Sequence, residues 1–162
     1  MIQELKSTNC FYPLEKGTYF IYDNDVKNEP DFVLEEERWN LKIVNETNEV
    51  VNFFQNDGCL IKQNELKKCD WICCFEKEFY FIEAKDVKKK KRKIQRNDAV
   101  EKFDSTIPYF LDLHPSIKEM RLIVVMNFRN SKITNAANKA KAAYFDEEYN
   151  AEYRETNILE FN

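Results

Sequence analysis

The chain has 162 residues, 43% of them hydrophobic and 14% aromatic, with two glycines, four prolines and a formal net charge of −4. This length suits a single domain of residues 1–162 with a core of about 32–150, and the composition excludes a disordered or fibrous protein. The negative charge argues against attraction of the whole surface to nucleic acid or membrane, although a sum over the chain can hide a local basic patch.

The sequence contains no obvious membrane segment and no secretory signal. No stretch approaches the roughly 20 apolar residues of a transmembrane helix, and the N-terminal residues lack a basic region followed by an apolar run. We therefore expect a cytoplasmic protein, in which the five cysteines are reduced thiols. An odd number of cysteines also excludes a complete set of disulfides.

The spacing of Cys69, Cys73 and Cys74 suggests a zinc site, but strand geometry argues against it. In a strand, Cys73 and Cys74 face opposite sides, whereas Cys69 and Cys73 lie about 13 Å apart, too far to share one zinc. Buried structural thiols are the better interpretation of all three.

The first half of the chain predicts several short strands. Residues 18–22 are β-branched and aromatic, which suits either a short strand or a packed N-terminal arm. Residues 41–45 and 50–54 are extended segments that flank the polar residues 46–49. This arrangement predicts a hairpin between the two segments. Asn56, Asp57 and Gly58 then predict a turn.

Residues 69–85 predict two buried strands joined by a second hairpin. Two apolar, aromatic-rich runs flank the charged residues 76–78, and both runs are apolar on both faces. This pattern is typical of central strands that are covered by helices.

A helix is predicted after the basic residues 88–93. Its start would be capped by Asn97 or Asp98, and Pro108 should kink it or divide it in two. Apolar residues recur at helical spacing and form one stripe. The stripe consists of Val100, Phe103, Ile107, Phe110 and Leu111.

The remaining residues complete an α/β pattern. Residues 120–128 predict a third buried strand, an alanine-rich helix opens at Thr134 or Asn135, and the C-terminal tail supplies either a last strand or loose packing. This order indicates an α/β sandwich with a central mixed β-sheet flanked by helices.

Asp70, Glu83 and Lys85 form the candidate site. Glu83 and Lys85 are two apart in a strand and share a face. If the hairpin closes with two or four residues, Asp70 lies directly opposite Glu83, whereas a three-residue loop would spoil that pairing. Two carboxylates so close repel each other, and a magnesium ion would resolve the conflict. A plain salt bridge between Glu83 and Lys85 is the alternative.

Residues 69–72, followed by a hairpin and by residues 81–85, resemble the core of the PD-(D/E)xK nucleases, a superfamily of restriction endonucleases and Holliday junction resolvases. The resemblance spans roughly residues 67–128 and implies a restriction endonuclease-like fold. It further implies a Mg²⁺ or Mn²⁺ cofactor held by Asp70, Glu83 and the carbonyl of Ala84, with Lys85 assisting hydrolysis of a phosphodiester.

The chain departs from the superfamily pattern in three respects. Cys69 stands where the name-giving proline would be, and Lys102 replaces a glutamine on the following helix. Members usually add an upstream acidic residue, for which several candidates exist. These candidates are Glu35, Glu36, Glu37, Glu46, Glu49 and Glu65.

The basic run after Lys85 predicts contact with a phosphate backbone, because a cluster of cations beside a metal site attracts polyanions. A solvated loop is the alternative, since blocks of like charge repel one another. The residues expected to bind nucleic acid are Lys88, Lys89, Lys90, Lys91, Arg92, Lys93 and Lys102.

The sequence as a whole predicts a metal-dependent nuclease acting on DNA, with RNA as the other candidate substrate. The resemblance suggests a setting in restriction, repair or defence against mobile elements, and a homodimer by analogy with enzymes that cut both strands. Two alternatives remain: an inactive nuclease fold that binds nucleic acid or protein, and a subunit or inhibitor in a multi-protein system. His114, the only histidine, is assigned to capping or to the surface.

Overall fold

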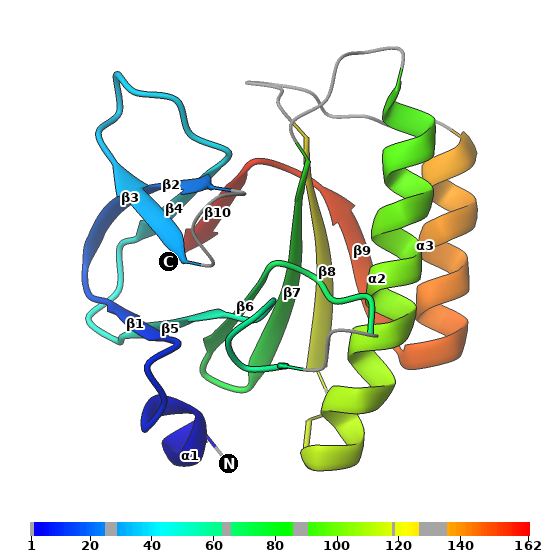
Figure 1. Ribbon diagram of the computed structural model, residues 1–162, viewed down its shortest axis with the longest axis horizontal. Coiled ribbons are helices and arrows are strands. Elements are labelled where there is room, and N and C mark those ends of the chain that lie inside the picture. Colours follow the sequence, from blue (N-terminus) through cyan, green and yellow to red (C-terminus); the bar gives the residue numbers. More distant parts are fainter. Residues whose placement is uncertain (1, 25–28, 63–65, 86–90, 118, 127–135) are drawn as a thin grey trace.

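The structure is a computed structural model that describes the chain except for residues 1, 25–28, 63–65, 86–90, 118 and 127–135. The helices and strands of the described residues are labelled in Figure 1. They are α1 (Ile2–Lys6), β1 (Phe11–Leu14), β2 (Gly17–Asp23), β3 (Pro30–Val33), β4 (Leu41–Asn45), β5 (Val51–Gln55), β6 (Trp71–Phe75), β7 (Glu78–Lys85), α2 (Arg92–Leu113), β8 (Glu119–Met126), α3 (Ala136–Tyr149), β9 (Ala151–Glu155) and β10 (Ile158–Phe161).

The strands form two sheets. The larger sheet is mixed and has the strand order β1-β5-β6-β7-β8-β9, antiparallel from β1 to β7 and parallel from β7 to β9. Helices α2 and α3 make the two parallel crossovers, which a tight turn could not bridge. The smaller sheet has the order β10-β4-β2-β3, with β10 parallel to β4.

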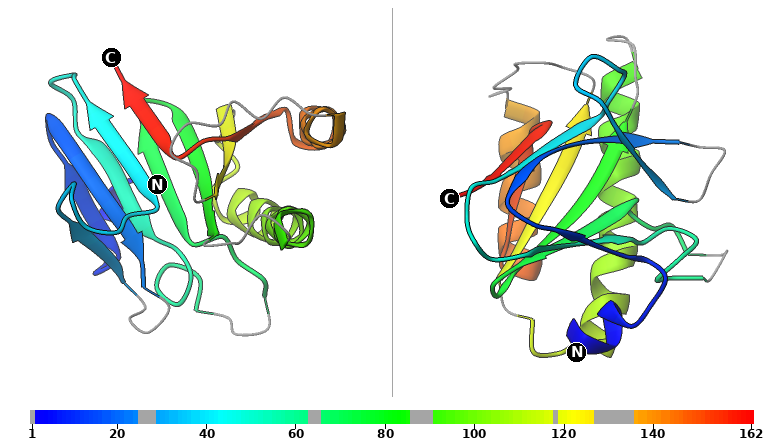
Figure 2. Two further views of the ribbon diagram at one scale, coloured as in Figure 1. Left: turned by 90° about the horizontal axis from the view of Figure 1, so that it is seen from above. Right: turned by 90° about the vertical axis from the view of Figure 1, so that its left-hand side faces the viewer.

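The elements stack in three layers, seen side by side in the left-hand view of Figure 2. Helices α2 and α3 cover one face of the six-stranded sheet, and the four-stranded sheet lies against the other. The predicted mixed α/β sheet is therefore confirmed, but in the part of the chain that the structure describes helices cover one of its faces and not both. Both faces of β6 and β7 are apolar because one packs on helices and the other on a second sheet.

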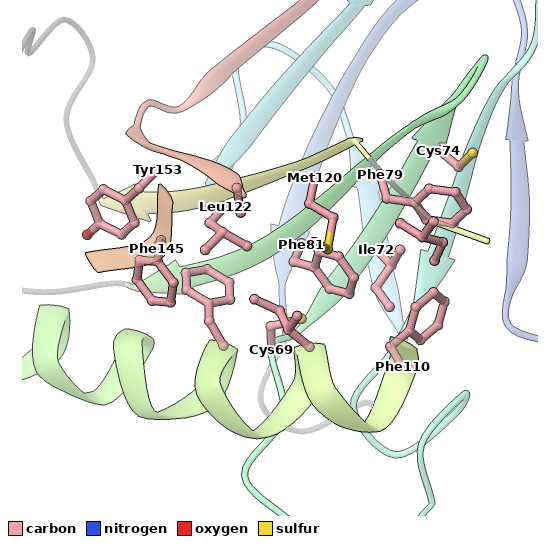
Figure 3. Packing of buried hydrophobic residues seen from close by; sticks show 14 of the residues in the cluster. Cys69, Ile72, Cys74, Phe79, Phe81, Phe110, Met120, Leu122, Phe145 and Tyr153 are labelled. Carbon is pink, nitrogen blue, oxygen red and sulfur yellow. The ribbon is translucent and has the colours of Figure 1, made fainter. Parts of the chain in front are cut away.

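The hydrophobic core has one part on each side of the six-stranded sheet. On the helix side, Phe81 of β7 meets Phe110 of α2 edge to face, with ring centroids 5.5 Å apart (Figure 3). Between the sheets, Trp71 is fully buried beside Phe53, with ring centroids 5.7 Å apart. The six-stranded sheet is therefore covered by apolar packing on both faces.

Strands β4 and β5 do not form the hairpin predicted across residues 46–49. β4 pairs with β2 and β10 in one sheet, and β5 pairs with β1 and β6 in the other. The Asn45 side chain stabilises the connection between the sheets, because its amide donates to the carbonyl oxygens of Leu14 and Glu49. The polar residues 46–49 do connect the two strands, but the strands pack into different sheets instead of pairing with each other.

Helix α2 begins earlier than predicted. It starts at Arg92, with Lys91 as its N-cap and no side-chain cap, so neither Asn97 nor Asp98 opens it. The early turns are held by tertiary contacts instead, since buried Arg96 forms an ion pair with Glu155 of β9.

The helix also continues through Pro108 to Leu113. Both sides of the proline are anchored by the predicted stripe, of which Phe103, Ile107 and Phe110 are buried. Packing thus outweighs the hydrogen bond that a proline removes. His114 caps the helix as predicted, its backbone N–H donating to the carbonyl oxygens of Phe110 and Leu111.

Most other predicted elements are present. The strands at residues 18–22 and 120–128, the turn after β5 and the C-terminal strand are confirmed, although residues 127–128 lie outside the described residues. Residues 134 and 135, the predicted start of the alanine-rich helix, also lie outside them. Strand β9 was not predicted, and both β1 and β9 extend the main sheet beyond the predicted core of 32–150.

The prediction of five free thiols is wrong for two cysteines. Cys10, before β1, forms a disulfide with Cys59, in the turn after β5. The pairing arises because β1 and β5 are neighbours in the sheet, which brings the ends of the two strands together. Cys69, Cys73 and Cys74 are free and buried, as predicted.

The expected cytoplasmic location stays a prediction. Within the described residues, no helix combines the length and the apolar character needed to cross a membrane.

Candidate metal centre

The β6–β7 hairpin has the register that the candidate site requires. It turns through the two residues Glu76 and Lys77, and Glu76 has the positive φ of 53° that suits a tight two-residue turn. Continuing this register one residue beyond β6 brings Asp70 opposite Glu83. The paired residues that fix the register are Phe75 and Glu78, Cys74 and Phe79, Ile72 and Phe81, and Trp71 and Ile82.

Asp70 is held by hydrogen bonds at both its side chain and its backbone. The backbone N–H of Ala84 donates to Asp70 Oδ2 at 2.7 Å. The Asp70 carbonyl oxygen accepts from the N–H groups of Asn56 and Asp57, at 2.9 and 3.3 Å. These contacts fix the carboxylate against β7. Burial raises its pKa, although the charge of Lys102 and the Ala84 hydrogen bond act in the opposite direction.

Helix α2 fixes the residue before Asp70. The Cys69 N–H donates to Thr106 Oγ1 at 3.0 Å, and the same hydroxyl donates to the Lys102 carbonyl oxygen at 2.7 Å. On the opposite side, the Asn56 side chain donates to the Cys69 carbonyl oxygen at 2.8 Å. The segment that carries Asp70 is thus joined both to α2 and to the turn after β5.

Glu83 is the most buried carboxylate of the cluster, with no exposed surface. Its Oε1 lies 2.6 Å from Lys102 Nζ and also forms a salt bridge with Lys85. Its Oε2 is buried and has no hydrogen-bond partner among the described residues. Burial, reinforced by the charge of Asp70, raises the pKa of Glu83 to about 8, against the opposing effect of the two lysines.

Lys85 is positioned by a carboxylate from α2. Its Nζ lies 2.7 Å from Asp98 Oδ2, and its side chain is only 12% exposed. Burial tends to raise the pKa of Asp98, but its hydrogen bond to Lys85 and the charge of Lys85 lower it overall. The ammonium of Lys85 is therefore fixed between two acids rather than extended into solvent.

Lys102 also faces the acidic pair. Its Nζ lies 2.6 Å from Glu83 Oε1 and 3.5 Å from Asp70 Oδ1, and its side chain is 20% exposed. Burial lowers the pKa of this lysine, but the charges of Asp70 and Glu83 outweigh burial and raise it. The structure therefore places Lys102 within the site, whereas the sequence suggested contact with nucleic acid.

Asp98 and Thr106 belong to the site but were not assigned to it from the sequence. With Lys102, they are spaced by four residues on α2 and so share one helical face. Applying this periodicity around Lys102 would have identified both residues.

The residues present fit a hard divalent cation. Carboxylate oxygens and a backbone carbonyl are the ligands that magnesium takes, and one or two carboxylates suffice because the ion keeps several waters. The unpartnered Glu83 Oε2 supplies a buried acceptor for such an ion. Within the described residues, no group of three or more His, Cys, Asp or Glu side chains is arranged to hold a metal, so any site here depends on two carboxylates and the Ala84 carbonyl.

No upstream acidic ligand is evident among the described candidates. Those at positions 35–37, 46 and 49 are all exposed, and Glu65 lies outside the described residues. Among the described acidic residues upstream of Asp70, Asp57 is the one whose charge contributes to the raised pKa of Asp70.

The basic run is described only in part. Lys91 and Lys93 are exposed at the start of α2, and Arg92 is half-buried. Lys88, Lys89 and Lys90 lie outside the described residues.

No known protein family, curated protein or solved structure matches the chain. Its function must therefore be inferred from the geometry of the site.

Proposed function

We propose that the chain is a divalent-metal-dependent nuclease of the PD-(D/E)xK type that hydrolyses phosphodiester bonds of DNA, with RNA as the other candidate substrate. The observation that carries the proposal is the environment of Glu83. A fully buried carboxylate retains one oxygen without a partner, beside a second buried carboxylate and a fixed lysine. An unpaired buried acceptor is costly, so its retention favours a ligand that completes the site.

The order of the elements also supports the proposal. Strands β5, β6 and β7 form an antiparallel meander, and α2 then crosses to β8, which is parallel to β7. The carboxylates lie at the end of β7 from which α2 departs. Within this order, the hairpin of β6 and β7, the helix and the strand that follows are the elements implied by the resemblance of residues 67–128.

Asp70, Glu83 and the carbonyl of Ala84 would hold Mg²⁺ or Mn²⁺. When bound, such an ion lowers the pKa of a water ligand and offsets charge on a phosphoryl oxygen. Asp70 Oδ2 is already engaged by the Ala84 N–H, which leaves Oδ1 directed at the cluster.

Lys85 would act on the phosphate under attack. Its ammonium is fixed between Glu83 and Asp98, so it needs little reorganisation to offset negative charge that develops in the transition state. Asp98 is then a positioning residue for Lys85.

The basic residues would bind the phosphate backbone. Lys91 and Lys93 are exposed six and eight residues after Lys85, so they are close to the site along the chain. Their contribution should be electrostatic and independent of base sequence.

A second candidate is a nuclease fold that binds nucleic acid or a protein without cleaving it. The observation that favours it is the position of Lys102, which already supplies a positive charge to both carboxylates. A catalytically inactive site could be stable with that charge alone.

A cleavage assay separates these functions. Purified protein is incubated with supercoiled plasmid and with single-stranded DNA and RNA, in Mg²⁺, Mn²⁺ or EDTA. Lys85→Ala is compared with Lys77→Ala, which removes the same charge from the exposed hairpin turn at the other end of β7.

The proposal expects cleavage by the wild type and by Lys77→Ala in metal, and loss of cleavage in EDTA or in Lys85→Ala. Cleavage that persists in EDTA contradicts it. Salt-sensitive binding without cleavage in any metal favours the second candidate.

A further inference from the structure

We infer that Lys102 is a built-in cation between Asp70 and Glu83, and that a divalent metal ion must displace its ammonium in order to bind. This inference rests on the proposed function, because it concerns how the same site takes up its metal.

The first support is the position of the ammonium. Lys102 Nζ contacts one oxygen of each carboxylate, at 2.6 Å from Glu83 Oε1 and 3.5 Å from Asp70 Oδ1. A divalent ion held by the two carboxylates would therefore meet this ammonium, because Lys102 Nζ lies beside both of them. The remaining oxygens differ, since Asp70 Oδ2 accepts the Ala84 N–H whereas Glu83 Oε2 has no partner among the described residues.

The second support is the balance of charge. When both acids are ionised, as metal binding requires, the buried carboxylates of Asp70 and Glu83 would without Lys102 face each other with only Lys85 to offset them, and Lys85 is already shared with Asp98. Like charges at such short range repel strongly in a site of low dielectric. Lys102 therefore allows the site to form before any metal is present.

The third support is that the ammonium has room to leave. Lys102 projects from α2 on a flexible unbranched side chain that is 20% exposed. Its backbone is fixed, because its carbonyl oxygen accepts from the Thr106 hydroxyl. Asp98 lies one helical turn earlier on the same face and offers a displaced ammonium another carboxylate. The side chain can thus move while the helix stays in place.

The consequence is a penalty on metal binding that Lys102→Gln would remove. A divalent ion entering the wild-type site must displace one positive charge, whereas the neutral amide of the variant does not compete with the ion. We expect Lys102→Gln to bind Mn²⁺ at least about tenfold more tightly than the wild type.

The test measures Mn²⁺ affinity by isothermal titration calorimetry on the metal-free protein. The wild type is compared with Lys102→Gln, with Lys102→Arg, which keeps the charge, and with Lys77→Gln, which loses a charge remote from the site. Tighter binding by Lys102→Gln alone supports the inference. Equal affinities for the wild type and Lys102→Gln overturn it and leave the proposed nuclease intact. Absence of Mn²⁺ binding in all four proteins overturns the metal-dependent function as well.

Folding provides a second measurement. Without metal, Lys102→Gln should melt below the wild type, and Mn²⁺ should raise its melting temperature more than that of the wild type. If Lys102→Gln is unfolded without metal, Mn²⁺ should restore its fold, and an unfolded protein in saturating Mn²⁺ overturns the inference.

Discussion

The backbone N–H of Ala84 donates a hydrogen bond of 2.7 Å to Asp70 Oδ2. This bond joins the two halves of the candidate site, since Ala84 lies between Glu83 and Lys85 on β7 and Asp70 lies just before β6. The position of one carboxylate is thus set by the strand that carries the other.

Replacing Asp70 separates its structural role from its charge. Asp70→Ala leaves the buried Ala84 N–H without an acceptor, whereas Asp70→Asn keeps an oxygen in place and removes the same charge. We expect Asp70→Ala to be less stable than Asp70→Asn by about 1–3 kcal/mol. Urea unfolding measures the difference, and equal stabilities would show that the bond does not hold Asp70. Both variants should lose metal-dependent cleavage.

The pKa of Glu83 predicts a pH dependence of stability. Burial raises this pKa to about 8 from an ordinary value of 4.5. Between these values the folded protein keeps a proton that the unfolded chain has released, so the free energy of unfolding falls as pH rises through this window. Glu83→Gln lacks this contribution.

The comparison requires urea unfolding of both proteins in EDTA at several pH values from 5 to 8. The stability of the wild type relative to Glu83→Gln should decrease as the pH rises. Parallel pH profiles for the two proteins would contradict the raised pKa.

The Cys10–Cys59 disulfide should stabilise the fold. It closes a long loop, with 49 residues of sequence separation, and so restricts the unfolded chain. Reduction, or replacement of both cysteines by serine, should lower the free energy of unfolding by about 2–4 kcal/mol. A urea midpoint that does not respond to a reducing agent would show that these cysteines are free thiols, as the sequence suggested.

The exposed lysines at the start of α2 should contact phosphate. We expect the double variant Lys91→Gln, Lys93→Gln to weaken DNA binding and to lower the salt dependence of log K by about 2, because each phosphate contact contributes roughly 0.9. The control is the double variant Lys16→Gln, Lys77→Gln, which removes the same charge from two exposed turns. The same reduction in both double variants would indicate a general effect of net charge.

The sequence predicts the site better than it predicts the surrounding sheets. The alignment of Asp70 with Glu83 follows from strand alternation and a short turn, both of which are local. The separation of β4 and β5 depends on which sheet buries each strand, and no local pattern encodes that choice. The second sheet was not predicted for a similar reason, because strands covered by helices and strands covered by a sheet carry similar apolar patterns.

Two further differences between the predicted and the observed fold, the disulfide and the start of α2, have specific physical causes. Cys10 and Cys59 meet only because β1 and β5 pair, and their distance along the chain gives no sign of it. The early start of α2 depends on the ion pair between Arg96 and Glu155, which links residues far apart in sequence. By contrast, the inclusion of Asp98 and Thr106 was encoded in the helical spacing around Lys102.

The most direct test of a metal centre at Asp70 and Glu83 is anomalous X-ray scattering from crystals of the protein soaked in Mn²⁺. We predict an anomalous peak for a Mn²⁺ ion within bonding distance of the Asp70 and Glu83 carboxylates and the Ala84 carbonyl. Lys102 Nζ should have moved away from Glu83 Oε1. The same soak of Glu83→Gln serves as the control and should show no peak there. A saturated wild-type crystal with no peak at this position, and with Lys102 still bridging the two carboxylates, would contradict the account.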